Sequence, residues 1–145
     1  MISLITGAEN AAAALNAQRV RMDVVSQNIA NANVSRGPDG KPYRRQQVVF
    51  EQVLQDQQHV AGDALGAKPQ LVRVARIQED KQPPRMLHMP GHPHADKQGN
   101  VAMPNVNIQE EMVDMIVSSR SFEANLASLK TARNMALQTL SIGKR

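Results

Sequence analysis

The sequence predicts an α+β protein in which long N- and C-terminal helices pair as an antiparallel coiled coil and hold a small β-rich insert between them. Two long segments, one at each end of the 145-residue chain, repeat apolar residues every seven positions. The middle of the chain instead holds all eight prolines, most of the glycines and short runs of β-branched residues. The expected division is an N-terminal helix over residues 1–34, an insert over 35–104 and a C-terminal helix over 105–145.

The segment from Asn105 to Leu140 contains no proline and no glycine. Its a and d positions are apolar over nearly five heptads, with Ser119 and Arg133 as polar breaks. A helix of this length spans about 50 Å, whereas a globule built from this chain would be only about 30 Å across. The helix therefore needs a partner along most of its length, either another helix of the chain or other copies.

The N-terminal pattern runs from Ala8 to Ala32, and the alanines at 11–14 favour a helix that a second helix can approach closely. We interpret it as the partner of the C-terminal helix rather than as a helix packed alone on a core. Because it is the shorter of the two, part of the C-terminal seam is expected to meet neighbouring subunits. The apolar positions of this expected assembly seam are Leu15, Met22, Ile29, Ile108, Met112, Met115, Phe122, Leu126, Leu129 and Leu140.

Turn and cap signals place the element boundaries. The asparagines at 28–33 predict the end of the first helix, and Gly37 to Pro42 predicts a turn. Strands are expected at 43–54, 71–77, 86–89 and 101–103, with a loop at 55–70, and Arg73 and Arg76 are expected to face solvent. Asn107 is the expected N-cap of the last helix, with Glu110 at capping-box spacing.

Composition excludes several classes of function. The net charge of +4 comes without a dense basic run, and with one Tyr, two Phe and no Trp the chain has almost nothing on which a base could stack. We therefore expect no nucleic-acid partner. There is no cysteine and no apolar run long enough to span a membrane. The first residues lack the basic start and the apolar run of a secretory signal, so we expect no cleaved signal peptide. A protein of this sequence that works outside the cytoplasm must leave by a route that reads no cleavable signal.

One cluster has the residue types of a metal site: His88, His92, His94 and Asp96. These residues lack the one-face helical spacing of a zinc motif, and the prolines among them favour a rigid packing loop. A metal-binding protein using this loop is the alternative interpretation of the sequence. Glu110, Glu111 and Asp114 are interpreted as partners of the helix dipole and as solvated surface. Ser118, Ser119 and Ser121 have no neighbouring histidine, so the sequence predicts no enzyme, no cofactor and no small-molecule substrate.

The chain contains two distinctive motifs. The first reads SQNIANAN from Ser26 to Asn33 and closes the N-terminal helix. It resembles the N-terminal signature of the bacterial flagellar rod, hook and hook-associated axial proteins. The second is spread over 91–125, where H-P-x-A-D, P-N-V-N and E-M-V-x-M-I follow in order; it is similar to the motif of proximal rod proteins of the basal body. Asn100 and Ser35-Arg36 depart from the family pattern. The motif positions carried over are Asn28, Ile29, Ala30, Asn31, His92, Pro93, Asp96, Pro104, Asn105 and Asn107.

The resemblance implies a structural subunit of the flagellar rod, the drive shaft that carries torque across the periplasm. Members of this family are exported uncleaved by the flagellar type III apparatus, and their terminal helices pair as a coiled coil and pack around a tube. The implied partners are other copies of the chain, other rod proteins and the adaptor between the export gate and the MS ring. The implied location is the rod of the basal body, in the periplasmic space.

Overall fold

The structure, a computed structural model, describes residues 2–54 and 70–143. It contains two long helices and four strands, in the order α1 (Ile2–Ala30), β1 (Gln46–Leu54), β2 (Gln70–Glu79), β3 (Arg85–His88), β4 (Asn100–Met103) and α2 (Ile108–Ile142). The predicted α+β class, with two terminal helices around a small β insert, is confirmed. The loop predicted over 55–70 lies outside the described residues, except for Gln70, which begins β2.

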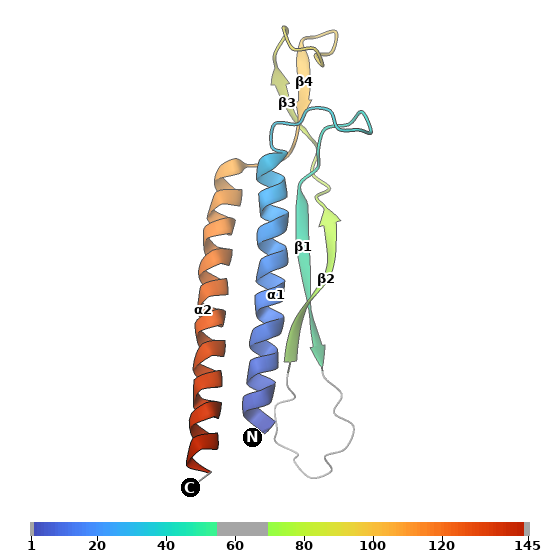
Figure 1. Cartoon of the computed structure of the whole chain (residues 1–145). Helices are drawn as coiled ribbons and strands as arrows, with labels where there is room; N and C mark the ends of the chain where they lie inside the picture. Colours follow the sequence, from blue (N-terminus) through green and yellow to red (C-terminus); the bar gives the residue numbers. More distant parts are fainter. Residues whose placement is uncertain (1, 55–69, 144–145) are drawn as a thin grey trace.

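The two helices run antiparallel and side by side, so that the start of α1 and the end of α2 lie at the same end of the molecule (Figure 1). Asn28 near the end of α1 contacts Glu111 near the start of α2, and Arg21 contacts Asp114. The predicted antiparallel pairing is therefore confirmed. α1 begins at Ile2, so the helix starts six residues before the apolar pattern predicted from Ala8.

The β1–β2 hairpin packs along α1, on the side away from α2 (Figure 1). Its strands pair antiparallel from Gln46 opposite Glu79 to Leu54 opposite Gln70, with a register shift between Val49 and Phe50. α1 is therefore covered on two sides. Its buried apolar positions Ala17, Val24 and Val25 are small or β-branched, which lets both neighbours approach its backbone closely. A fourth buried position is the polar Asn28.

The remaining residues, 31–45 and 80–107, form a head above the ends of the helices (Figure 1). β3 and β4 pair antiparallel there, from Arg85 opposite Met103 to His88 opposite Asn100. Gly99 has φ 78°, and a Cβ at this position would lie 3.0 Å from the His88 ring, so only glycine fits the turn before β4. The head's own small core consists of Ala32, Val101, Pro104 and Val106.

Asn107 caps α2 as the sequence predicts. Its side-chain oxygen accepts a hydrogen bond from the Gln109 N–H at 3.2 Å, and its amide donates to the Glu110 carboxylate at 2.9 Å. The Glu110 carboxylate therefore contacts the cap side chain, where a capping box would have it accept from the cap backbone. At the other end, the Gly143 N–H donates to the Thr139 carbonyl in a right-handed conformation. None of the helices within residues 2–54 and 70–143 is both long and apolar enough to cross a membrane.

We expect Asn107→Ala to lower the free energy of unfolding by about 1 kcal/mol, because the N-terminal amides of α2 lose their side-chain acceptor. Asn107→Ser supplies another good cap and should stay within about 0.5 kcal/mol of the parent. Urea unfolding followed by circular dichroism measures both. Equal stability of the Ala and Ser variants would show that the cap does not limit the stability of α2.

Candidate functional site: a polar junction and an exposed helix face

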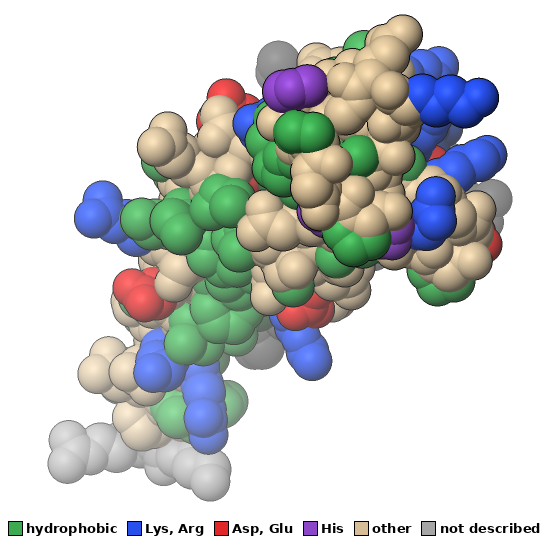
Figure 2. All heavy atoms as spheres, turned by 90° about the horizontal axis from the view of Figure 1, so that it is seen from above, with side chains coloured by type: hydrophobic (Ala, Val, Ile, Leu, Met, Phe, Trp, Pro, Cys, Tyr) green, Lys and Arg blue, Asp and Glu red, His purple; other side chains and the backbone are tan. Residues whose placement is uncertain are grey.

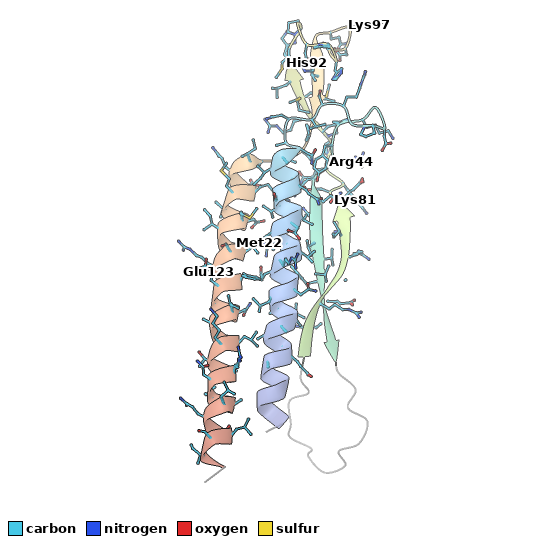
Figure 3. The ribbon with its side chains drawn as sticks, in the orientation of Figure 1. Met22, Arg44, Lys81, His92, Lys97 and Glu123 are labelled. Carbon is cyan, nitrogen blue, oxygen red and sulfur yellow. The ribbon has the colours of Figure 1, made fainter. Side chains whose placement is uncertain are left out.

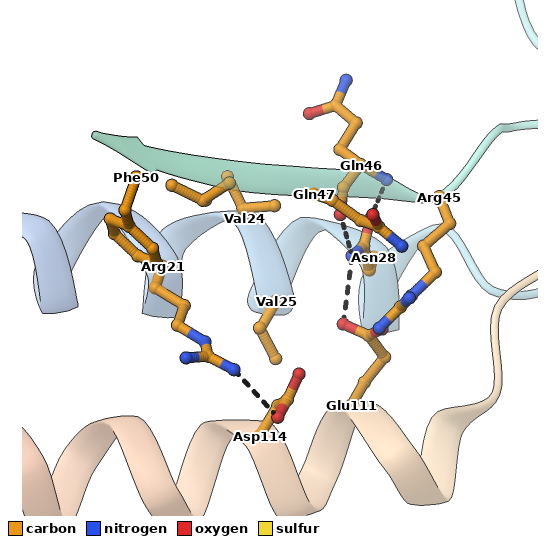
Figure 4. A pocket seen from close by; sticks show the side chains of 11 residues that line it. Arg21, Val24, Val25, Asn28, Arg45, Gln46, Gln47, Phe50, Glu111 and Asp114 are labelled. Atoms are coloured by element: carbon orange, nitrogen blue, oxygen red, sulfur yellow. Dashed lines mark hydrogen bonds and ion pairs between the residues drawn. The ribbon is translucent and has the colours of Figure 1, made fainter. Parts of the chain in front are cut away.

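A buried polar junction ties the two helices to the start of β1. At its centre is Asn28, whose side chain is 1% exposed. Its amide nitrogen donates to the Gln46 carbonyl at 2.9 Å and to the Glu111 carboxylate at 3.0 Å. Its oxygen accepts from the Gln46 N–H at 2.9 Å and from the Tyr43 hydroxyl at 2.8 Å. All four hydrogen-bonding positions of this amide are thus occupied, by groups of Tyr43, Gln46 and Glu111. Figure 4 shows the bonds to Gln46 and Glu111.

Arg45 closes the junction from the head side. Its Nε lies 2.5 Å from Glu111 Oε1, its Nη1 lies 4.0 Å from Asp80, and its backbone N–H donates to the Asn105 side chain at 3.0 Å. Glu111 is only 1% exposed. The interpretation of Glu111 as solvated surface was therefore wrong. Its carboxylate can be buried because the Arg45 charge and the Asn28 amide compensate for its removal from water.

A hollow of about 390 Å³ lies beside the junction, between α1, β1 and the first turns of α2. Val24 and Val25 form its apolar side, and Arg21 and Asp114 meet across its edge at 3.1 Å (Figure 4). Both charged side chains of this pair are about one-third exposed. Asp114 is thus an interhelix partner as well as a residue of the helix start, and water can reach the pair.

Tyr43 brings a titratable hydroxyl group into the junction. Burial raises the pKa of its hydroxyl above the ordinary value of 10.0, and the nearby carboxylates of Glu111 and Glu79 raise it further. The neutral hydroxyl is the form that donates to Asn28. The junction therefore requires a protonated tyrosine.

We expect stability to fall with rising pH in the alkaline range through Tyr43. The unfolded chain loses this proton near pH 10, whereas the folded chain keeps it to higher pH. The contribution is thus complete below pH 10 and is lost as the pH rises through the folded pKa. Tyr43→Phe should cost about 1 kcal/mol at neutral pH and show a shallower alkaline decline, measured by urea unfolding. Parallel declines for the two proteins would contradict this role.

The N-terminal motif positions lie at the end of α1. Asn31 donates from its side chain to the Gln27 carbonyl at 2.8 Å, Ile29 is half-buried and Ala30 is exposed. In the second motif, Pro104 is fully buried, Asn105 holds the Arg45 N–H and Asn107 caps α2. The structure thus brings Asn28 and Asn105, far apart in the sequence, to the same junction.

The histidine loop is held by its own hydrogen bonds. The His92 and His94 rings lie edge to face with centroids 5.2 Å apart, and His92 Nδ1 accepts from the His94 N–H. His94 Nδ1 lies 2.9 Å from the Ser35 hydroxyl and His88 Nδ1 lies 3.2 Å from the Asn100 side chain. Asp96 Oδ1 accepts from the N–H groups of residues 98 and 100, and Pro93 is exposed.

The residues that depart from the family pattern, Ser35 and Asn100, therefore each hold a histidine in this loop. Among the described residues, no group of three His, Asp or Glu side chains is arranged to hold a metal ion. The alternative of a metal-binding protein finds no support in this geometry.

The seam residues lie in two different environments. The half-buried group faces partners within the chain and consists of Leu15, Met22, Ile29, Met115, Phe122, Leu126 and Leu129. Ile108, Met112 and Leu140 are exposed, at 36%, 52% and 59%. The most deeply buried positions of α2 are instead Glu111 and Ser118, a row that periodicity of apolar residues did not reveal. Glu111 and Ser118 are seven residues apart and lie four residues before Met115 and Phe122, on the same face of the helix. A search for apolar residues alone therefore passes over both of them.

An apolar face of α2 points away from α1. It comprises Ile108, Met112, Val113, Ile116 and Val117, which are 36% to 59% exposed. Figure 2 shows apolar side chains gathered on the α2 side of the molecule, next to the head. Met135, Leu137, Leu140 and Ile142 continue the exposure toward the C-terminal end. Contiguous exposed apolar surface of this kind is typical of interaction sites.

Both ends of the chain match models of flagellar families. Residues 9–36 match the family described as "Flagella basal body rod protein", and residues 97–142 match "Flagellar basal body rod FlgEFG protein C-terminal". The chain is 43% identical over 143 residues to the flagellar basal-body rod protein FlgC of Yersinia enterocolitica, covering 99% of this chain and 100% of that one. The chain belongs to the FlgC family of flagellar basal-body rod proteins.

Two further FlgC proteins are similar over nearly the whole length. That of Borreliella burgdorferi is 40% identical, covering 97% of this chain and 98% of the relative. That of Bacillus subtilis is 38% identical, covering 92% and 93%. The predicted resemblance to flagellar rod proteins is therefore confirmed. The first matched segment covers α1 from residue 9 onward and contains Asn28, and the second covers the whole of α2 and contains Glu111.

Proposed function

We propose that this chain is a structural subunit of the flagellar basal-body rod. The observation that carries the proposal is its similarity, over 99% of its length, to a protein named as a basal-body rod subunit. The subunits assemble helically with further copies and with other rod proteins, and the resulting shaft transmits torque. The role is mechanical, so the chain acts as a building block rather than as an enzyme.

The exposed face of α2 supports assembly through this helix. Met112, Val113 and Ile116 are each more than half exposed in the isolated chain. A helical tube requires heterologous contacts that do not close into a ring of fixed symmetry. The apolar face on one side of the long helix α2 gives each subunit a continuous surface for such a contact. The half-buried seam positions, which α1 partly covers, add to this surface.

The remaining parts of the proposal concern transport and location. We propose export through the flagellar type III apparatus without cleavage, and final placement in the periplasmic part of the rod. The proposed neighbours are further copies, other rod proteins and the adaptor between the export gate and the MS ring. Both helices carry a seven-residue apolar repeat, the pattern of helices that pack against other helices along their length. This supports a subunit whose helices gain further helix contacts from neighbouring subunits in the rod.

We expect Ile116→Glu to abolish swimming in the parent bacterium when it replaces the native copy. Ile116 is 54% exposed, so the isolated chain should keep its stability within about 0.5 kcal/mol. A glutamate buried in a subunit contact costs several kcal/mol, so isolated basal bodies should lack the subunit. Soft-agar motility and immunoblots of purified basal bodies measure both effects.

Asn134→Glu is the matched control, because it adds the same charge to an exposed polar position of α2. It should swim normally and enter basal bodies. A swimming Ile116→Glu strain with normal subunit content would overturn the role of this face. Normal swimming after deletion of the whole chain would overturn the rod function itself.

A further inference from the structure

We propose that the head carries a binding site for a protein carboxylate, on an acidic segment of a partner. The site is a small pocket between residues 41–44 and residues 82–84, with Asn105 in its wall. It is separate from the apolar face of α2, and it does not depend on the rod assignment. Three observations carry it: the charge of the head, the composition of the pocket and the state of the Asn105 amide.

The head concentrates the positive charge of the molecule. Residues 31–45 and 80–107 contain seven Lys or Arg and three Asp or Glu, an excess of four that equals the net charge of the whole chain. Arg45 is paired with Glu111. Asp80 accepts hydrogen bonds from the Gln47 side chain and the Gln82 N–H, and Asp96 accepts from the N–H groups of residues 98 and 100. The other six cations are exposed and form no ion pair with any described residue: Arg36, Lys41, Arg44, Lys81, Arg85 and Lys97. Figure 3 shows three of them, Arg44, Lys81 and Lys97, from the top of the hairpin to the tip of the head.

The pocket lies within this positive surface. Its volume is about 80 Å³, and Lys41 and Arg44 both line it while no carboxylate does. A water molecule occupies about 30 Å³ in the liquid, so the pocket has room for the three heavy atoms of a carboxylate but not for a bulky group. Two prolines, Pro42 and Pro84, stiffen its walls.

Asn105 supplies a donor that has no acceptor. Its Oδ1 accepts from the Arg45 N–H at 3.0 Å, which fixes the orientation of the amide. Its Nδ2 is buried and makes no hydrogen bond to any described residue. An unsatisfied buried amide is energetically unfavourable, and an entering carboxylate oxygen would remove that cost. Lys41, Arg44 and the Asn105 amide together form a set of donors, which matches an acceptor-only ligand.

The partner is an acidic peptide segment rather than a free small acid. One carboxylate fits the pocket, and the other exposed cations of the head surround it at longer range. A segment with several Asp or Glu residues would use both, gaining charge-assisted hydrogen bonds in the pocket and steering from the rest of the head.

The test uses the full chain with two probes, sodium acetate and a fluorescent oligo-glutamate peptide, at ~50 mM salt to limit screening. Acetate should shift the side-chain NH₂ resonances of Asn105 in a saturable way, measured by NMR. The peptide should bind more tightly than acetate, measured by fluorescence anisotropy.

Two variants with the same change of charge distinguish binding in the pocket from attraction by the overall positive charge of the head. Asn105→Asp keeps an oxygen for the Arg45 N–H but replaces the donor with an acceptor, and it should weaken peptide binding at least about tenfold. Arg85→Gln removes one charge outside the pocket and should weaken it by no more than about twofold. If Asn105→Asp fails to fold, Lys41→Gln, at an exposed side chain in the pocket, replaces it and should also weaken binding more than Arg85→Gln.

Three results would overturn the proposal. Equal weakening by the pocket and control variants would assign the binding to general charge attraction. Tighter binding of inorganic phosphate than of acetate, or binding to vesicles of anionic lipid in preference to the peptide, would assign the site to a phosphate group. If acetate causes no saturable shift of the Asn105 side-chain NH₂ resonances, the pocket does not bind a carboxylate.

Discussion

Replacing Asn28 with alanine is expected to lower the free energy of unfolding by about 3 kcal/mol. The substitution removes four hydrogen bonds at once and leaves the Gln46 backbone, the Tyr43 hydroxyl and the Glu111 carboxylate short of a partner. Each buried group left unsatisfied costs about 1–3 kcal/mol, and water entering the adjacent hollow recovers part of the sum. Urea unfolding followed by circular dichroism measures the loss.

Two variants test the cause of that loss. Asn28→Asp has the same shape but turns an oxygen toward the Gln46 carbonyl and the Glu111 carboxylate, so it should destabilise at least as much as alanine. Asn31→Ala removes a single exposed hydrogen bond, to the Gln27 carbonyl, and should cost no more than about 1 kcal/mol. If Asn28→Ala cost no more than Asn31→Ala, the junction would not be what holds the head to the helices.

The predictable part of the fold was the part set by local signals. A seven-residue apolar repeat specifies a helix with one covered face, and asparagine signals specify where α1 ends and α2 begins, so both helices and the Asn107 cap followed from sequence. The strands followed from short β-branched runs between turn residues, although β2 extends to Glu79, beyond the predicted Ile77. The solvent-facing prediction for Arg73 and Arg76 is also confirmed.

The junction could not be predicted in the same way. Arg45 and Glu111 are 66 positions apart, and nothing in the local sequence of either residue specifies the other. A glutamate in the first turn of a helix is ordinarily explained by its interaction with the helix dipole. That explanation gave no reason to expect that Glu111 is buried. Asn28 was singled out only as a motif residue and as a helix-end signal. Its role in the junction, four hydrogen bonds to Tyr43, Gln46 and Glu111, depends on tertiary geometry.

The junction gives the family motifs a physical meaning within this chain. Asn28 comes from the N-terminal motif, while Glu111 and Asn105 come from the C-terminal one, and Arg45 lies between them in sequence. Their side chains fix the head, β1 and both helices in one arrangement. For a subunit proposed to carry torque, a rigid joint between the helix pair and the head would pass load from one to the other instead of absorbing it by bending.

The second large effect is expected at the buried ion pair of this joint, and the chain contains a matched exposed pair. Arg45–Glu111 and Arg73–Glu51 both have a closest N–O distance of 2.5 Å, but the Glu111 side chain is 1% exposed and the Arg73 and Glu51 side chains are 70% and 42% exposed. Arg45→Met should cost about 3 kcal/mol, because it leaves a carboxylate buried without its cation. Arg73→Met should cost less than about 1 kcal/mol, because water solvates both partners.

Double-mutant cycles separate the pair energy from other losses. Combining Arg45→Met with Glu111→Leu should recover much of the stability lost in Arg45→Met alone, since no unpaired charge then remains buried, giving a coupling energy of about 2–3 kcal/mol. The cycle of Arg73→Met with Glu51→Leu should give a coupling below about 1 kcal/mol. Equal couplings in the two cycles would mean that water reaches Glu111, and that apolar packing rather than the buried ion pair holds α2 to the head.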